Sequence, residues 1–211
     1  MRARRVVWAA VAVLVVAVGI VILVITKKPD HPAADAAAAS ATSTPATVAV
    51  GADSLPPWPA PLDATAAAGA AGLPMLSSEG MVEHIHVHLD VLVDGKPVAV
   101  PASIGIDAAR RGISPLHTHD DSGVIHIESP VKREFSLGEF FTEWGVSLSA
   151  DNIGGLRATD GKTVRVYVNG QPRTGDPAAI IFNQHDEIAL IYGAPQPTET
   201  PPATYEFPPG D

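Results

Sequence analysis

The fold is decided by the stretch HIHVHLDVLV at residues 84–93, in which apolar and polar side chains alternate. A period of two is typical of a β-strand that buries one face. Asp94-Gly95 follows directly and is a signal for a tight turn, so residues 97–100 are expected to return as the second arm of a hairpin. One face of the strand would carry Ile85, Val87, Leu89, Val91 and Val93, and the other His84, His86, His88, Asp90 and Leu92.

Three further strands are predicted at residues 124–128, 163–168 and 187–192. In the first of them Ile125 and Ile127 would point inward, and His126 and Glu128 outward. Asn169-Gly170 ends the second strand with another turn signal.

One helix is predicted after the strand at residues 124–128. Ser136 and Glu139 form a capping box, and Gly145 supplies a stop. The residues between them repeat at helical spacing, with Leu137, Phe140, Phe141 and Trp144 on one side. The sequence therefore predicts an α+β fold, in which a small mixed sheet carries one amphipathic helix on one face.

The chain divides into four predicted parts. Residues 1–28 form a cytoplasmic stub and a membrane anchor, and residues 29–79 form a disordered linker rich in Ala and Pro. Residues 80–193 form the His-rich folded unit, and residues 194–211 form a disordered tail with six prolines.

The anchor is predicted from 21 uncharged residues, Val6–Thr26, between Arg2, Arg4, Arg5 and Lys27, Lys28. Such a stretch is long enough for one transmembrane helix and longer than the apolar part of a cleavable signal peptide. The excess of positive charge before it predicts that the N-terminus stays inside. We therefore expect a single-pass protein of the cytoplasmic membrane, with an extracytoplasmic C-terminal domain.

Charge and composition exclude several classes of function. The formal net charge is −9, and all 23 acidic residues lie after residue 28, whereas five of the 14 Lys and Arg lie within residues 1–28. An acidic domain attracts cations and disfavours nucleic acid as a partner. The sequence holds no cysteine, which excludes disulfides, Fe–S clusters, thiolate zinc sites and blue-copper centres.

Six of the eight histidines lie between residues 84 and 126, and this cluster predicts a metal site. Alternate residues of a strand share a face, so two histidines of the first strand can bind one ion together with ligands from elsewhere. Imidazole suits Zn²⁺ and Cu²⁺. Carboxylate ligands would come from Asp120 or Glu128. The predicted metal ligands are His84, His86, His88, His117, His119 and His126. Metal capture, delivery or sensing is the function that this cluster favours.

Two other functions fit the same residues. One is a metal-free module, pH-responsive because histidine titrates near neutrality, that recognises an envelope protein. The other is a metal-dependent hydrolase with Glu128 or Asp121 as general base. His88-Leu89-Asp90 matches part of a two-His-one-carboxylate iron site, but no other catalytic motif is found. The sequence favours binding over catalysis and assigns no catalytic residue.

Three blocks carry a resemblance to a known group of proteins: His84–Leu89, His117–Asp120 and Ser122–Pro130. They resemble an uncharacterised family of membrane-anchored, His-rich exported proteins of high-GC bacteria and some archaea. The resemblance implies export and a shared site, with no reaction attached. The stretch Val164–Gly193 is also similar to the last strands of β-grasp proteins.

Overall fold

The computed structural model describes residues 44–211, and a mixed β-sheet with two α-helices forms this part of the chain. The prediction of an α+β fold is confirmed at this level, with a second α-helix added. The elements are α2 (Ala64–Ala70), β1 (Glu83–Val93), β2 (Lys96–Val98), β3 (Ile106–Asp107), β4 (Gly112–Ile113), β5 (Leu116–His117), β6 (Val124–Ser129), α3 (Leu137–Trp144), β7 (Leu148–Ser149), β8 (Asn152–Ile153), β9 (Leu156–Arg157), β10 (Thr163–Val168), β11 (Gln171–Arg173), the 3₁₀ turn η1 (Pro177–Ala179) and β12 (Glu187–Gly193).

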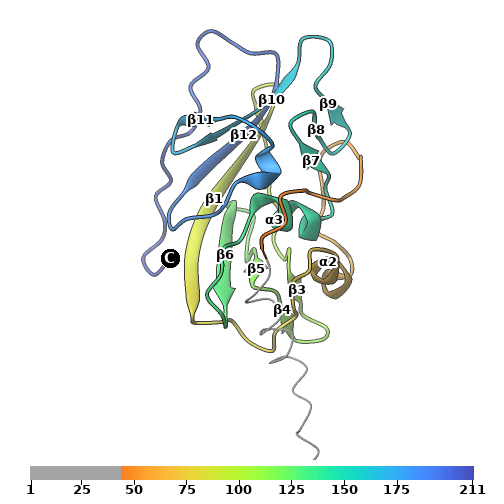
Figure 1. Cartoon of the computed structure of the whole chain (residues 1–211), viewed down its shortest axis with the longest axis vertical. Coiled ribbons are helices and arrows are strands. Elements are labelled where there is room, and N and C mark those ends of the chain that lie inside the picture. The colour runs from red at the N-terminus through yellow and green to blue at the C-terminus, as the bar shows by residue number, and fades with distance from the viewer. Residues whose placement is uncertain (1–43) are drawn as a thin grey trace, which may run out of the picture. The chain divides into compact units, whose positions relative to one another are not determined.

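β1 is the central strand of the main sheet (Figure 1), whose order is β11-β10-β12-β1-β6-β5. The second half of β1 pairs in parallel with β12, and its first half pairs antiparallel with β6. β2 returns beside the end of β1, as the Asp94-Gly95 turn predicts. Asp94 and Asn169 both have positive φ, and each is followed by a glycine with positive φ, which is the geometry of a two-residue hairpin turn.

The alternation of β1 divides the sheet into an apolar and a polar face. Val87, Leu89 and Val91 are buried in the core, and Ile125 and Ile127 of β6 join them from the neighbouring strand. Figure 1 shows α3 lying across this sheet. The aromatic side chains Phe140, Phe141 and Trp144 of α3 fill the space between helix and strands.

The predicted capping box of α3 is present. The Ser136 hydroxyl accepts from the Glu139 backbone N–H, while the Glu139 carboxylate accepts from the Ser136 backbone N–H. Gly145 ends the helix in a left-handed conformation that a glycine adopts without strain. Both helix ends are therefore fixed by the residues that the sequence predicts.

A disordered linker was predicted over residues 29–79. For residues 44–79, the part that the structure describes, this prediction is wrong. Residues 44–79 pack on the domain: α2 contacts α3, and Trp58, only 2% exposed, lies edge-on to Trp144. The Trp144 indole N–H also donates to the Trp58 carbonyl oxygen. Small side chains explain the difference, because Ala68 is fully buried and lets the helix approach closely even though the segment lacks large periodic apolar residues.

The tail, residues 194–211, holds no helix or strand, but it is not unpacked as predicted. The Tyr205 ring stacks on His88 at 3.8 Å, and the Phe207 ring stacks on His185 at 4.6 Å between centroids. Glu199 pairs with Arg165 of β10. Because His88 belongs to the polar face, the tail covers that face, opposite the apolar core.

The predicted membrane anchor, Val6–Thr26, lies outside the described residues. Within residues 44–211, none of the helices has the length and apolar character needed to cross a bilayer.

Candidate metal site

Three histidines from three neighbouring strands lie in one line on the polar face. Strand pairing places His86 of β1 opposite His126 of β6, and His126 opposite His117 of β5. Their ring centroids are 4.6 Å apart for His86 and His126, and 5.2 Å apart for His126 and His117. The separation of adjacent strands, about 4.8 Å, therefore sets the separation of the rings.

Two more histidines extend this line at its ends. The His84 ring lies 5.1 Å from the His86 ring, two residues along β1. The His119 ring, from the loop after β5, lies 4.8 Å from the His117 ring and 4.5 Å from the His126 ring. His117 is the last residue of the short strand β5, and the pairing of this strand with β6 aligns it with His126.

Glu128 lies among four of these five rings. It is opposite His84 in the strand register, and its Oε1 lies 3.3 Å from His126 Nδ1, 3.5 Å from His84 Nε2 and 3.7 Å from His86 Nε2. Its Oε2 lies 3.9 Å from His117 Nε2. We refer to Glu128 and these five histidines as the His–Glu128 cluster, defined as His84, His86, His117, His119, His126 and Glu128.

Glu128 is ionised. Burial opposes the charged carboxylate, but hydrogen bonds from His126 and His86 and the charge of neighbouring histidines outweigh it. Together they hold the pKa of Glu128 well below its ordinary value. A carboxylate in this state can accept a cation.

His117 is neutral and has its free nitrogen in the cluster. Burial lowers the pKa of this fully enclosed ring to about 4, against the opposing charge of Glu128. Its Nδ1 donates to the Ser114 carbonyl oxygen at 2.9 Å, so the lone pair belongs to Nε2. A metal-binding histidine in a protein has this arrangement, since its second nitrogen is normally held by a backbone carbonyl or a carboxylate.

Several buried polar atoms of the cluster lack a hydrogen-bond partner in the described part of the chain. They are His117 Nε2, His86 Nδ1 and Glu128 Oε2. Buried polar groups without partners are rare, because each costs about 1–3 kcal/mol. A bound cation would supply the missing partner.

Glu79 and Asp211 add two carboxylates at the border of the cluster, and the sequence analysis missed both. Glu79 Oε1 lies 3.7 Å from His119 Nε2, and Asp211 Oδ1 lies 4.0 Å from His86 Nε2. Both residues come from segments that were predicted to be unpacked. The aromatic residues Tyr205 and Phe207 in a proline-rich tail were the available signal that this tail is anchored.

Asp120 and Asp121, the other carboxylates considered from the sequence, are exposed. Asp120 accepts from the Ser122 backbone N–H at 2.9 Å and shapes the turn before β6.

His88 does not join the cluster, although it was predicted as a ligand. Its Nδ1 lies 2.7 Å from Glu187 Oε2, and its Nε2 lies 2.8 Å from the Ser122 carbonyl oxygen. Burial opposes protonation, but the hydrogen bond and charge of Glu187 outweigh it and raise the pKa of His88. Both ring nitrogens therefore have partners, and the Tyr205 ring covers one face of the imidazole. Through these contacts His88 links β1 to β12 and to the tail.

The donor atoms lie close enough to hold a metal ion. In one set, His117, His119 and His126 place one ring nitrogen each within 4.8 Å of the others, and in a second set His84, His86 and Glu128 do the same. Tetrahedral zinc with bonds of about 2.0–2.1 Å needs donors about 3.4 Å apart, so side-chain rotations alone can complete either set. Several groups of His and Glu in this domain can therefore hold a metal ion.

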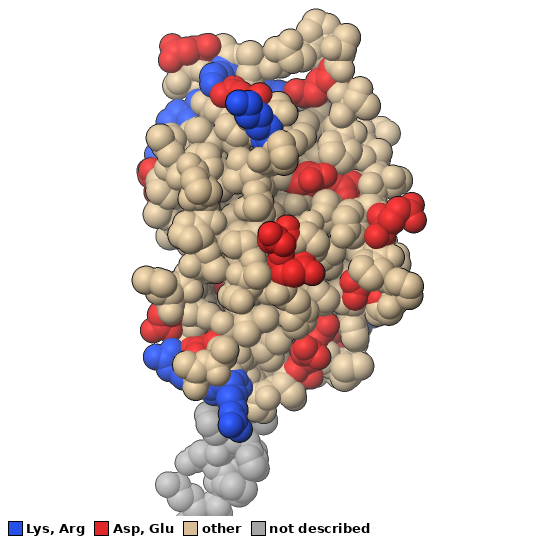
Figure 2. Space-filling model, turned by 180° about the vertical axis from the view of Figure 1, so that it is seen from behind, with Lys and Arg blue, Asp and Glu red and all other residues tan. Residues whose placement is uncertain are grey.

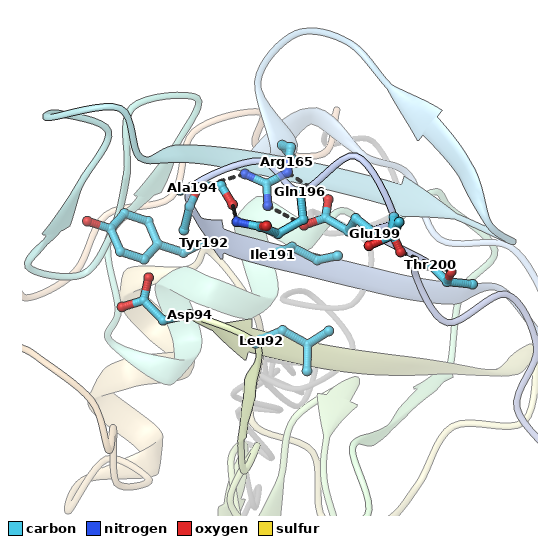
Figure 3. A pocket seen from close by; sticks show the side chains of 12 residues that line it. Leu92, Asp94, Arg165, Ile191, Tyr192, Ala194, Gln196, Glu199 and Thr200 are labelled. Carbon is cyan, nitrogen blue, oxygen red and sulfur yellow. Dashed lines mark hydrogen bonds and ion pairs between the residues drawn. The ribbon is translucent and has the colours of Figure 1, made fainter.

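The polar face also carries a pocket of about 520 Å³ farther along the sheet. Figure 3 shows Arg165 reaching Glu199 across it, with Leu92 and Ile191 on its floor. Arg165 donates to both Glu199 carboxylate oxygens and to the Gly193 carbonyl oxygen, so its charge is already compensated. The ion pair of Arg165 with Glu199 therefore holds the tail against β10 beside this pocket.

Comparison with known proteins gives no match: no protein-family model, no curated protein and no solved structure is similar to this chain.

Proposed function

We propose that this domain binds a divalent transition-metal ion, Zn²⁺ or Cu²⁺, through His117, His119 and His126. The observation that carries the proposal is the buried Nε2 of His117, which has no hydrogen-bond partner and whose ring is fixed by the Ser114 carbonyl oxygen. Its low pKa keeps that nitrogen deprotonated at neutral pH, as a metal ligand must be.

The other two ligands, His126 and His119, differ in what holds them. His126 donates from Nδ1 toward Glu128, which leaves its Nε2 for the metal, while His119 has a half-exposed side chain. Three imidazoles with a fourth position open are a donor set suited to Zn²⁺ and Cu²⁺. The sequence offers no thiol that would select Cu⁺, and the thioether of Met81 beside β1 is 73% exposed.

Metal capture, delivery or sensing is the role that we propose for this site. The exposure of His119, 45% of its side chain, gives an ion a route to the buried His117 from solvent. Acidic side chains support the approach of cations: Figure 2 shows them spread over one face of the domain, whereas basic side chains gather toward its upper and lower ends. Negative potential of this kind raises the local concentration of cations.

We also propose the cellular setting that the sequence predicts. Val6–Thr26 would anchor the chain in the cytoplasmic membrane with the N-terminus inside, and the metal-binding domain would lie outside. Membership in the exported His-rich family and a β-grasp-like core remain part of this proposal. The parallel pairing of β12 with β1 supports the β-grasp likeness.

Metal content of the purified full chain tests the binding. The chain is solubilised in a mild detergent, incubated with Zn²⁺, dialysed and analysed for zinc by atomic absorption. We expect stoichiometric zinc in the wild type and in His185→Ala, which removes an exposed histidine outside the cluster, and loss of zinc in His117→Ala and His126→Ala. Zinc-free wild-type protein would contradict the proposal and favour a metal-free interaction module.

A further inference from the structure

We propose that the His–Glu128 cluster holds two divalent ions, the second bound by His84, His86 and Glu128, with the Glu128 carboxylate bridging to the ion at His117, His119 and His126. This inference rests on the proposed function and extends it from one ion to a dinuclear centre.

The first argument is that the cluster divides into two complete donor sets without a shared residue. His117, His119 and His126 form one set, and His84, His86 and Glu128 form the other. The two sets have the same design, because each combines a buried histidine, His117 or His86, with an exposed one, His119 or His84.

The second argument is the orientation of Glu128. Its Oε1 faces His84 and His86 and also lies 3.3 Å from His126 Nδ1, whereas its Oε2 faces His117 Nε2 and has no hydrogen-bond partner among the described residues. A carboxylate whose two oxygens face two donor sets can bind one ion with each oxygen. In two-metal sites the ions lie about 3.5–4 Å apart, a spacing that one carboxylate spans.

The third argument is what a single ion would leave behind. An ion at His117, His119 and His126 makes no use of His86, which is 2% exposed and has an unpartnered Nδ1. The second ion would bind this ring through Nε2, the nitrogen that lies 3.7 Å from Glu128 Oε1.

The fourth argument is charge. In the described part of the chain, the cluster carboxylate Glu128 and its neighbours Glu79 and Asp211 form ion pairs only with histidines, and none with Lys or Arg. If the histidines are neutral ligands, the buried carboxylate of Glu128 lacks a cationic partner, and the two more exposed carboxylates stand beside it. Two divalent ions balance this negative charge, and Asp211, which with His86 and His126 forms a further donor group, can complete the coordination of the second ion.

The experiment uses Cu²⁺ with the full chain, because copper reports both the number of ions and their separation. Bound copper is counted after dialysis, and electron paramagnetic resonance is recorded at one and at two equivalents. We expect two bound equivalents. The signal at two equivalents should fall below that of two isolated ions, with a half-field transition, because ions at this spacing couple magnetically.

Two variants assign the ions to their sets. His84→Ala and His119→Ala each change an exposed side chain outside the core, and each is expected to bind one equivalent with an ordinary mononuclear spectrum. His31→Ala, which removes a histidine outside the described residues, is the control and should keep two coupled ions.

The outcomes separate this inference from the proposed function. One equivalent in the wild type overturns the dinuclear centre and keeps the single site. Two equivalents without magnetic coupling, or loss of the second equivalent in His31→Ala, also overturn it, because the second ion would then lie elsewhere. No bound copper overturns both proposals.

Discussion

Replacing His117 by glutamine should change how the stability of the metal-free protein depends on pH. Burial lowers the pKa of His117 from 6.5 to about 4, so the folded state keeps this ring neutral where the unfolded chain protonates it. The unfolded state therefore binds more protons as the pH falls, and this ring makes the free energy of unfolding decrease between pH 6.5 and 4.5. Glutamine does not titrate, and its amide can donate to the Ser114 carbonyl oxygen as the imidazole does.

The magnitude follows from the two pKa values. Integrating proton binding from pH 6.5 to 4.5 gives about 2 kcal/mol of stability lost by the wild type through His117 alone. Other groups act in the opposite direction, because burial raises the pKa of Glu143 and of Glu187. Protonation of these carboxylates in the folded state adds stability as the pH falls, so the informative quantity is the difference between wild type and variant.

Urea unfolding of both proteins in the presence of a chelator, at pH 6.5 and at pH 4.5, measures this difference. Between these two pH values, the free energy of unfolding should fall by about 2 kcal/mol more in the wild type than in His117→Gln. Equal changes in the two proteins would refute the reasoning, because His117 would then titrate alike in the folded and unfolded states.

Three further predictions test other parts of the structure. Zinc at a hundredfold excess over Kd should stabilise the full chain by about 2.7 kcal/mol per ion and raise Tm by about 5–10 °C in calorimetry, and an unchanged Tm would argue against binding. Ser136→Ala, which removes the cap of α3, should cost about 1 kcal/mol in urea unfolding, whereas Ser136→Thr should retain most of the stability; equal losses would mean that the cap does not contribute. Trp58→Ala should cost about 3–5 kcal/mol by the same assay, and a loss below 1 kcal/mol would show that residues 44–79 do not pack on the domain.

The main sheet and helix α3 could be predicted from the sequence because their signals are local. Alternation in residues 84–93, the two hairpin turns and the Ser136–Glu139 capping box each depend on neighbours within a few positions. The packing of residues 44–79 could not be predicted, because it depends on Trp58 meeting Trp144 and on alanines that fit only against this particular helix.

The candidate site was predictable in part for the same reason. The face shared by His84, His86 and His88 follows from the strand period, but the line His86–His126–His117 depends on the register of β1, β6 and β5. His88 stays apart from the cluster because it bonds to Glu187. The parallel pairing of β12 with β1 brings Glu187 beside it, and no local sequence pattern predicts this contact.

Diffraction data collected at the zinc absorption edge, from crystals grown with zinc, test the central claim most directly. We predict an anomalous peak at about 2.0–2.1 Å from a ring nitrogen of each of His117, His119 and His126. Density that shows these three rings without a peak between them, or a peak bound only to surface carboxylates, would contradict the account.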